Sequence, residues 1–356
     1  MAEITPRRQT TPRTPTVIAL DLQSEQAVGA LVNETGRILV TRAVPIQKTT
    51  VRATVAAISQ SILDLAHAPE RKLVAIKGIG ISVPGNVDQR AGRVSFTHHD
   101  SFNWERVPLG SMIEKALETS GVDIRFSATA SPVREAKMES AHPPFAVYAN
   151  RDTQVAAEAW CGAAAGKSNV VMLSLDAPIS AGILVNHKIL HGTGDHAGAL
   201  GFFALSESYK TEYATKGALT FEASEAALLR RTLEHWTADS DSLLSQVTLT
   251  DPGQLTATMI LRAARSGDPF ALRVVEETCG WIGRAIANLI SLLNPEAVVI
   301  GGTFGLKLKP FLSTIRREAK QWANPIAARQ CQIVTAKLGE QSRLLGAARL
   351  AWMKVK

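Results

Sequence analysis

The chain reads NRDTQVAAEAWCG at residues 150–162, VVMLSLDAPISAGILV at 170–185 and GTGDHAGALG at 192–201. The first segment has the composition of the start of a helix. The second holds two apolar runs around a short break, which predicts a pair of strands. The third is a glycine-rich return. This order of helix, strand pair and glycine-rich loop indicates an α/β fold.

Working outward, the same order of elements is expected twice along the chain, although the two halves share almost no sequence identity. Each half begins with three strands and continues through helices to a buried strand. We therefore predict two domains, each a sheet flanked by helices, around a cleft. The expected strands are 17–22, 27–32, 37–45 and 73–83 in the first half, and 170–175, 182–185 with 188–190, 199–205 and 297–300 in the second. The expected helices include 50–66, 219–235 and 269–293.

Composition limits where the protein works. The chain has 356 residues, of which 46% are apolar, enough to build sizeable cores. No apolar run approaches the ~20 residues that span a bilayer, and the first residues lack the apolar centre of a signal peptide. Cys161, Cys279 and Cys331 are far apart. We expect a cytoplasmic protein without membrane contact or a cysteine metal site.

The net charge is +7 and the pI is about 9.4. Such a balance suits nucleic acid or phosphorylated partners, but here the charges are scattered along the chain, which favours a solvated surface. Residues 1–16 are polar and contain three prolines together with Arg7, Arg8 and Arg13. We expect them to form a disordered tail; a basic arm that touches DNA is the weaker alternative.

Four segments resemble the ROK family of bacterial sugar kinases and sugar-responsive repressors. They are GIGISVPGNVD at 78–88, EAWCG at 158–162, NPEAVVIGG at 294–302 and LGAA at 345–348. The resemblance implies a two-domain, actin-like ATPase (ribonuclease H-like) fold with duplicated halves. The domains implied are 17–148, 149–342 and a closing helix, 343–356, that packs back on the first domain.

The resemblance also implies nucleotide-binding residues. Asp21 matches the aspartate of the first phosphate loop, but DLQSEQ at 21–26 has none of the glycines of that loop, and Glu25 would repel phosphate. Gly182 is the one glycine kept from the second loop. Gly301 and Gly302 match the glycine pair beside the nucleotide; close ligand approach and a tight turn are both open explanations.

The second phosphate loop matches residues 176–182, DAPISAG, and departs from the family pattern at two further positions. Pro178 has no backbone N–H to donate. Asp176 adds a negative charge. Both changes oppose phosphate binding.

The catalytic base of the family matches Asn150, by counting back from Glu158. An amide cannot accept the proton of a sugar hydroxyl at neutral pH. Asp152 is the candidate for a displaced base. Alternatively, Asn150 or Asp152 caps the helix that follows.

The sugar and zinc motifs are altered as well. Asp100, near Trp104, stands where the family has an asparagine, so Asp100 and Asn150 are the expected sugar contacts. Ala199 and Phe202 replace the Glu and His of a later motif. Residues 207–222 contain no cysteine, so we expect no zinc. Glu222 is expected to lie on a solvated face.

Three hypotheses remain. The first is a sugar-kinase-like protein without catalysis that senses a sugar or nucleotide, or regulates. The second is a divergent, glucokinase-like kinase that uses ATP and Mg with Asp152 or Asp100 as base. The third is a transcriptional regulator without its DNA-binding domain; with only a short polar tail before Val17, direct DNA binding is not expected. The family implies a homo-oligomer, such as a dimer.

Overall fold

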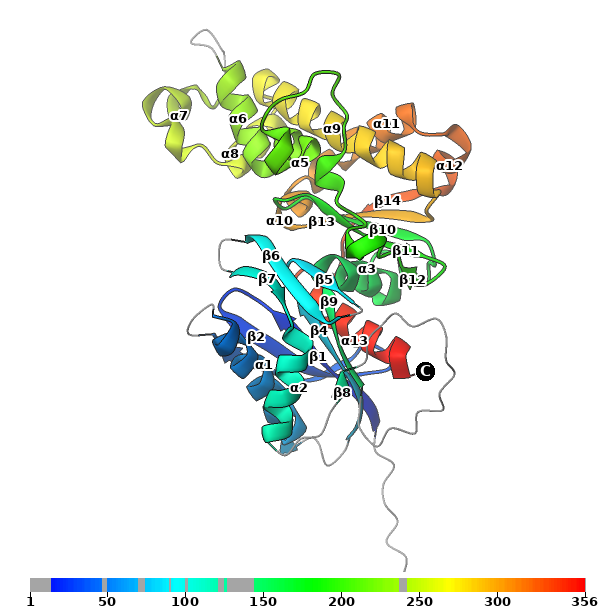
Figure 1. The fold of residues 1–356 in the computed structure, drawn as a ribbon. Coiled ribbons are helices and arrows are strands. Elements are labelled where there is room, and N and C mark those ends of the chain that lie inside the picture. Colours follow the sequence, from blue (N-terminus) through cyan, green and yellow to red (C-terminus); the bar gives the residue numbers. More distant parts are fainter. Residues whose placement is uncertain are drawn as a thin grey trace, which may run out of the picture. The chain divides into compact units, whose positions relative to one another are not determined.

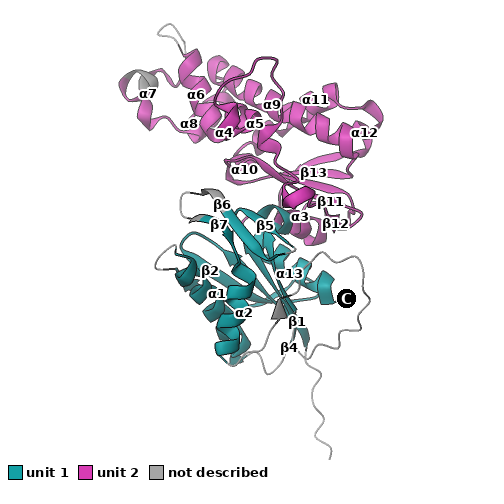
Figure 2. Ribbon diagram, in the orientation of Figure 1, with its two compact units in different colours: residues 1–153, 343–356 teal, residues 154–342 magenta. Residues whose placement is uncertain are grey.

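A computed structural model describes residues 14–46, 50–69, 74–89, 91–99, 102–120, 125–126, 144–236 and 242–355. The chain divides into two compact units (Figure 2). Unit 1 comprises the chain up to Thr153 together with the segment from Arg343 onward, and unit 2 comprises Gln154–Ser342. The two units are described one at a time below.

Unit 1 is built on a six-stranded sheet with the order β3-β2-β1-β4-β9-β8 (Figure 1). The first three strands are antiparallel to one another, and β1, β4, β9 and β8 run parallel. The bounds are β1 Thr14–Leu22, β2 Gln26–Asn33, β3 Ile38–Pro45, β4 Val74–Val83, β8 Arg125–Phe126 and β9 Pro144–Ala149. A smaller antiparallel sheet contains β5 Asn86–Asp88, β6 Arg93–His99 and β7 Phe102–Val107.

Helices cover both faces of the larger sheet in unit 1. Helices α1 (Val51–Ala66, with Thr50 as N-cap) and α2 (Leu109–Thr119) share a core with alternate residues of β1, including Ile18 and Leu20. Helix α13 (Gln341–Val355) lies against Gly80 of β4, where a Cβ would overlap the carbonyl oxygen of Ala347. A side chain at position 80 would therefore push this helix off the sheet.

Unit 2 repeats the topology with the order β12-β11-β10-β13-β14. Again three antiparallel strands come first, and two strands parallel to the innermost of them follow. The duplicated sheet-and-helix architecture expected from the sequence is thus observed. The bounds are β10 Val170–Ser174, β11 Ser180–Val185, β12 Lys188–Ile189, β13 Ala297–Gly301 and β14 Gln332–Thr335.

Strand β10 shows why the sheet of unit 2 needs cover on both sides. Val171 and Leu173 belong to a large core with α9 (Pro269–Leu293), whereas Val170 and Met172 pack with residues of α3 (Asn150–Cys161). Alternate residues of a strand face opposite ways, so a continuous apolar run buries both faces. The remaining helices are α4 Tyr213–Lys216, α5 Ala218–Ala223, α6 Glu225–His235, α7 Ser245–Thr250, α8 Ala257–Arg265, α10 Thr303–Lys307, α11 Leu312–Trp322 and α12 Pro325–Gln330.

Two expected elements are wrong. Residues 199–205 are not a strand: the short 3₁₀ turn η3 (Leu200–Phe202) stands there, and Phe202 and Phe203 donate to carbonyls three residues back. The third antiparallel strand of this sheet is β12 instead. The helix expected at 219–235 is two helices, because Ser224 is extended and caps α6 through Ala227 N.

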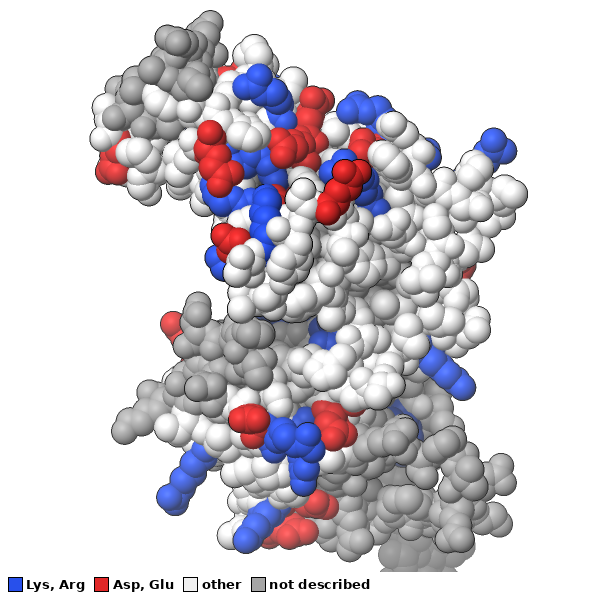
Figure 3. All heavy atoms as spheres, turned by 45° about the horizontal axis from the view of Figure 1, so that its top comes forward, with Lys and Arg blue, Asp and Glu red and all other residues white. Residues whose placement is uncertain are grey.

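The first strand begins inside the segment that the sequence predicts to be a tail. Strand β1 begins at Thr14, inside the expected tail 1–16, and residues 1–13 lie outside the described residues. Among the helices that the structure describes, none is long and apolar enough to cross a membrane. Basic and acidic side chains are interspersed on the face shown in Figure 3, as the scattered charges of the sequence led us to expect.

Candidate functional site

In unit 1, two of the candidate residues meet where parallel strands end. Asp21 of β1 is the register partner of Ser82 of β4. Ser82 Oγ donates to Asn150 Oδ1 over 2.8 Å, and Asn150 begins α3 directly after β9. Ser82 therefore links Asp21 and Asn150 at the carboxyl edge of the sheet, where α/β proteins bind ligands.

The carboxylate of Asp21 is buried and already paired. Arg343 Nε lies 3.0 Å from Oδ1 and 3.1 Å from Oδ2, and Gln23 Nε2 donates to Oδ2 over 2.9 Å. A buried carboxylate needs such partners, because burial alone would penalise its charge. In this chain an arginine of α13 supplies the positive charge at Asp21.

The β1–β2 turn, which matches the first phosphate loop, is closed by its own groups. The backbone N–H of Gln23 donates to the carbonyl of Gln26 over 2.9 Å, and Gln26 Nε2 donates to Gln23 Oε1 over 2.9 Å. The carbonyl of Glu25 accepts from Ile46 N. Side chains thus fill a turn in which a phosphate-binding loop would need glycines and open amides.

Asn150 belongs to a compact polar group at the start of α3. Ser82 Oγ lies 2.7 Å from Thr153 Oγ1, and Thr153 Oγ1 donates to the carbonyl of Asn150 over 2.9 Å. Helix α13 packs against this group at Gly346, where a Cβ would overlap the carbonyl oxygen of Thr153. Packing and hydrogen bonds therefore hold the Asn150 amide in one orientation.

Asp152, the candidate displaced base, is only 3% exposed. Its Oδ1 lies 3.8 Å from Arg151 Nε, and Arg151 Nη1 donates to Asn86 Oδ1 over 2.8 Å. It lies in the first turn of α3, where a negative charge is favourable. Burial beside an arginine suits a structural carboxylate. Asp100, the other candidate, lies outside the described residues.

In unit 2, Asp176 occupies the N-terminus of α10. Its Oδ1 accepts from the backbone N–H of Thr303 over 2.7 Å and of Phe304 over 3.4 Å, and Ser174 Oγ lies 3.4 Å from Oδ2. Amides at the start of a helix attract anions, and here a side chain of the chain itself is that anion.

The loop 176–182 offers few amides to a phosphate. Ile179 N donates to Thr220 Oγ1 over 3.0 Å, Ala181 N donates to the carbonyl of Gly198 over 2.8 Å, and Pro178 has no N–H. Gly182 lies inside β11, paired with Met172 of β10, and not in the loop. The residues of this loop do not fit the phosphates of a nucleotide.

Packing accounts for both Gly301 and Gly302. A Cβ on Gly301 would overlap Met172 Cε, and a Cβ on Gly302 would come 2.8 Å from Asp176 Oδ2. Gly302 also has a φ of 81°, which favours glycine. The tight turn, one of the two explanations left open by the sequence, is therefore sufficient here.

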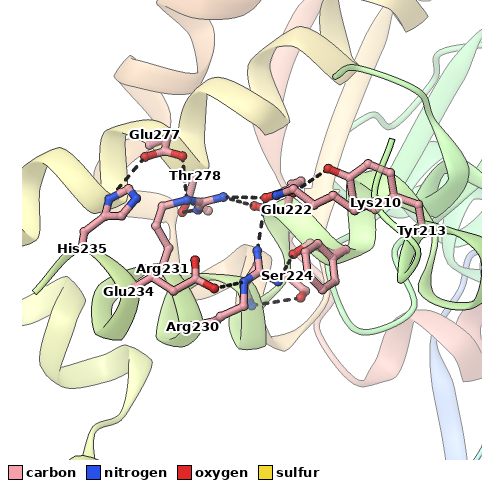
Figure 4. Close-up of polar contacts among 12 residues, drawn as sticks. Lys210, Tyr213, Glu222, Ser224, Arg230, Arg231, Glu234, His235, Glu277 and Thr278 are labelled. Atoms are coloured by element: carbon pink, nitrogen blue, oxygen red, sulfur yellow. Dashed lines mark hydrogen bonds and ion pairs between the residues drawn. The ribbon is translucent and has the colours of Figure 1, made fainter. Parts of the chain in front are cut away.

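Glu222 corrects an expectation from the sequence, because it is 4% exposed and does not lie on a solvated face. Figure 4 shows it among the partners that it joins. Its Oε1 accepts from Lys210 Nζ and Tyr213 Oη at 2.6 Å each. Its Oε2 lies 3.2 Å from Arg230 Nη2 and 3.3 Å from Arg231 Nη2.

The pKa values in this group follow from the contacts. Burial acts to raise the pKa of Glu222, but hydrogen bonds from Lys210 and Tyr213 outweigh burial and hold it below its usual value. The hydrogen bond to Glu222 raises the pKa of Lys210. Glu222 is therefore a carboxylate at neutral pH, with Lys210 charged beside it.

The residues that replace the Glu and His of the sugar motif are both exposed. Ala199 is exposed, and Phe202 is 55% exposed. Among the described residues, no group of three or more His, Cys, Asp or Glu side chains is arranged to hold a metal.

Glu158 is fully buried and accepts from the backbone N–H groups of Lys337 and Leu338, at 3.0 Å each, and of Ala163.

Several residues of these groups were not among the sequence candidates: Ser82, Arg343, Thr220, Lys210 and Arg231. Arg343 is 322 positions from Asp21, so no local spacing connects them. Thr220 and Lys210 lie in the altered zinc region, 207–222. Their contacts with Ile179 N and Glu222 depend on how the loops fold. One signal was present, since Asp176 introduced a charge into a loop that normally holds phosphate.

Comparison with known proteins places the chain. The sequence model of the ROK family matches residues 17–142 and 129–354, nearly the full length. The chain belongs to the ROK family. The resemblance found in the sequence and the actin-like fold that it implied are therefore confirmed.

The chain is similar to glucokinases and to a transcriptional regulator. A glucokinase of Halalkalibacterium halodurans is 29% identical over 273 residues, 76% of this chain and 74% of the relative. The structure of a ROK family transcriptional regulator, a homolog of the E. coli MLC protein, matches with a TM-score of 0.75 at 22% identity, covering 96% of this chain and 81% of that one. A ROK family glucokinase from Streptomyces griseus, in complex with glucose and AMPPNP, has a TM-score of 0.68 at 23% identity and coverages of 95% and 99%.

Proposed function

We propose that this ROK protein has lost phosphoryl transfer and acts as a sugar-sensing or regulatory module. The observation that carries the proposal is the contact of Asp176 with the backbone amides of Thr303 and Phe304. A phosphate at the same amides would have to displace a carboxylate of the chain and would meet its charge. The proposal therefore starts from the competition between the Asp176 carboxylate and a phosphate for the same two amides.

Unit 1 supports the proposal at two points. Asn150 stands where the family resemblance puts the base, and an amide cannot take a proton from a hydroxyl at neutral pH. Asp21 is neutralised by Arg343 at 3.0 Å, so its charge is already balanced without a metal ion. A kinase must hold phosphate and deprotonate a hydroxyl, and the groups for both tasks are changed.

The proposal is tested by incubating the protein with labelled ATP, Mg²⁺ and a panel of hexoses. We expect no sugar phosphate, and we expect ADP to leave the melting temperature unchanged. At least one sugar should raise the melting temperature, and the increase should grow with the logarithm of its excess over the dissociation constant. Saturable ATP-dependent turnover would contradict the proposal.

A divergent ATP-dependent sugar kinase is the second candidate, favoured by the 29% identity to a glucokinase. In that case Asp152 is the remaining candidate base among the described residues, although its burial must then change on ligand binding. Turnover that is lost in Asp152→Ala and kept in Asp152→Glu would establish this candidate and reject the first.

A transcriptional role is the third candidate, favoured by the likeness to a ROK transcriptional regulator. A gel-shift with fragmented genomic DNA separates it from simple sugar sensing. Retardation that resists moderate salt and responds to a sugar would support it, because non-specific phosphate contacts weaken steeply with salt. Retardation that vanishes at moderate salt would indicate charge alone.

A further inference from the structure

A cavity lies beside the edge strand β14 of unit 2, and none of its lining residues belongs to the sites described above. Its volume is about 390 Å³, and it is lined by Arg316 and Lys320 of α11 and by residues 331–334. Helix α11 carries the two cations four positions apart, so both project from the same face of the helix.

The two cations have no carboxylate partner within the described part of the chain, unlike their neighbours on α11. Arg317 pairs with Glu276 at 3.9 Å, and Glu318 pairs with Arg284 at 3.2 Å. Like charges at this spacing destabilise a helix, and no acidic residue lines the cavity. An anion inside the cavity would relieve that repulsion.

The guanidinium of Arg316 is held in place. Its Nε and Nη2 donate to the carbonyl oxygen of Ile333 over 2.9 and 2.7 Å. The structure gives Nη1 no hydrogen bond to a described residue. A guanidinium that is fixed at one edge loses little freedom when its other edge binds an oxyanion.

Most of the other residues that line the cavity are apolar. Cys331 and Ile333 are buried apolar side chains, and Val334 is half-buried. A cavity lined by two cations and by apolar residues is complementary to a ligand with a doubly charged head and an apolar body.

We propose that this cavity is a binding site for a small organic phosphate, a monoester whose dianion lies between Arg316 and Lys320 and whose organic part covers Ile333. The proposal does not depend on the lost phosphoryl transfer, because all lining residues lie on α11 and on residues 331–334. A site of this kind would let a phosphorylated metabolite bind the protein apart from its sugar.

Titration calorimetry with three probes tests the chemistry. Phenyl phosphate carries both features, inorganic phosphate lacks the apolar body, and phenyl sulfate is a monoanion. We expect phenyl phosphate to bind most tightly, with a dissociation constant at least about tenfold below those of the other two. Equal binding of all three probes would overturn the proposal.

Variants then locate the site. Lys320→Glu should weaken phenyl phosphate at least about tenfold, yet leave the melting temperature unchanged or higher, because Glu would pair with Arg316 at the same spacing. Arg317→Gln is the matched control on the same helix and should leave the dissociation constant unchanged. Binding that persists in Lys320→Glu, or falls equally in Arg317→Gln, would refute the site.

Discussion

The side chain of Glu222 receives four donors, and one of them, Arg231, is itself only 3% exposed. Replacing Glu222 by Gln keeps the shape but removes the charge that Arg231 faces. Arg231 would keep its ion pair with Glu277 at 2.7 Å but would lose the buried carboxylate at Nη2, so we expect the free energy of unfolding to fall by about 2 kcal/mol. Urea denaturation monitored by circular dichroism would measure it.

The matched control is Glu234, whose side chain is 56% exposed and pairs with Arg230 at 3.2 Å. An exposed ion pair contributes less than about 1 kcal/mol, so Glu234→Gln should change little. Similar losses in the two variants would mean that burial does not set the strength of these contacts.

The same carboxylate gives a pH dependence. The pKa of Glu222 lies below its usual value, against the effect of burial, because Lys210 and Tyr213 donate to it. Its contribution is therefore complete above the unfolded pKa of about 4.3 and is lost as pH falls through the lower folded pKa. We expect the stability difference between wild type and Glu222→Gln to be constant from about pH 7 to 5 and to shrink below about pH 4. A difference that grows in acid would contradict the assignment.

At the level of single residues, the sequence showed which side chains carry a charge but not which groups they contact. The sequence predicts that the negative charge of Asp176 opposes phosphate binding, whereas its role as cap of α10 depends on residues more than a hundred positions away. Glu222 was expected on a solvated face because no metal ligand lay near it in sequence. Its four partners come from two segments, one around α4 and the other on α6, which the fold brings together.

Among the elements, α13 depends on close backbone contact at Gly346. A Cβ there would overlap the carbonyl oxygen of Thr153 in the segment that orients Asn150. Gly→Ala within a helix normally stabilises, but overpacking against backbone costs about 1–3 kcal/mol or more. We expect Gly346→Ala to lower the melting temperature, as measured by calorimetry.

Gly280 in α9 is the comparison for Gly346. A Cβ at Gly280 would come no closer than 3.4 Å to a flexible arginine side chain. Gly280→Ala should therefore raise stability by about 0.4–1 kcal/mol, because it restricts only the unfolded chain. Stabilisation by both substitutions would show that α13 can shift away from Thr153 without cost.

Element by element, long apolar runs were predicted well, and short glycine-rich segments were not. Helix α9 was expected at 269–293 and lies there, with Asp268 as N-cap and Asn294 in the left-handed conformation at its end. Residues 199–205 have apolar residues spaced like a strand, but Gly198 has a φ of 85° and a Cβ there would overlap the carbonyl of Ala181. That close approach turns the chain, and hydrophobic spacing alone does not reveal it.

For the whole molecule, the sequence predicted a duplicated architecture from element order, and the two sheets share one topology. The resemblance implied that the last helix packs on the first domain, but the sequence could not supply the individual contacts of α13 with β2 and β9. Trp352 Nε1 donates to the carbonyl of Asn33 over 3.2 Å, and Tyr148 Oη donates to the carbonyl of Leu350 over 3.3 Å. These pairs are separated by hundreds of positions, so periodicity carries no trace of them.

Helix α13 is therefore part of unit 1, and a substitution at Trp352 tests how much its packing stabilises that unit. Trp352 is 4% exposed, so Trp352→Ala should cost about 3–5 kcal/mol through lost burial and the cavity left behind. Hydrogen exchange followed by mass spectrometry should show faster exchange in β1, β2 and β4, with β10 and β13 unchanged, because their core is separate. Met353 is 38% exposed, so Met353→Ala should leave hydrogen exchange unchanged in the strands of both units. Equal acceleration in both sheets would show that the two units unfold as one cooperative body and not each with its own core.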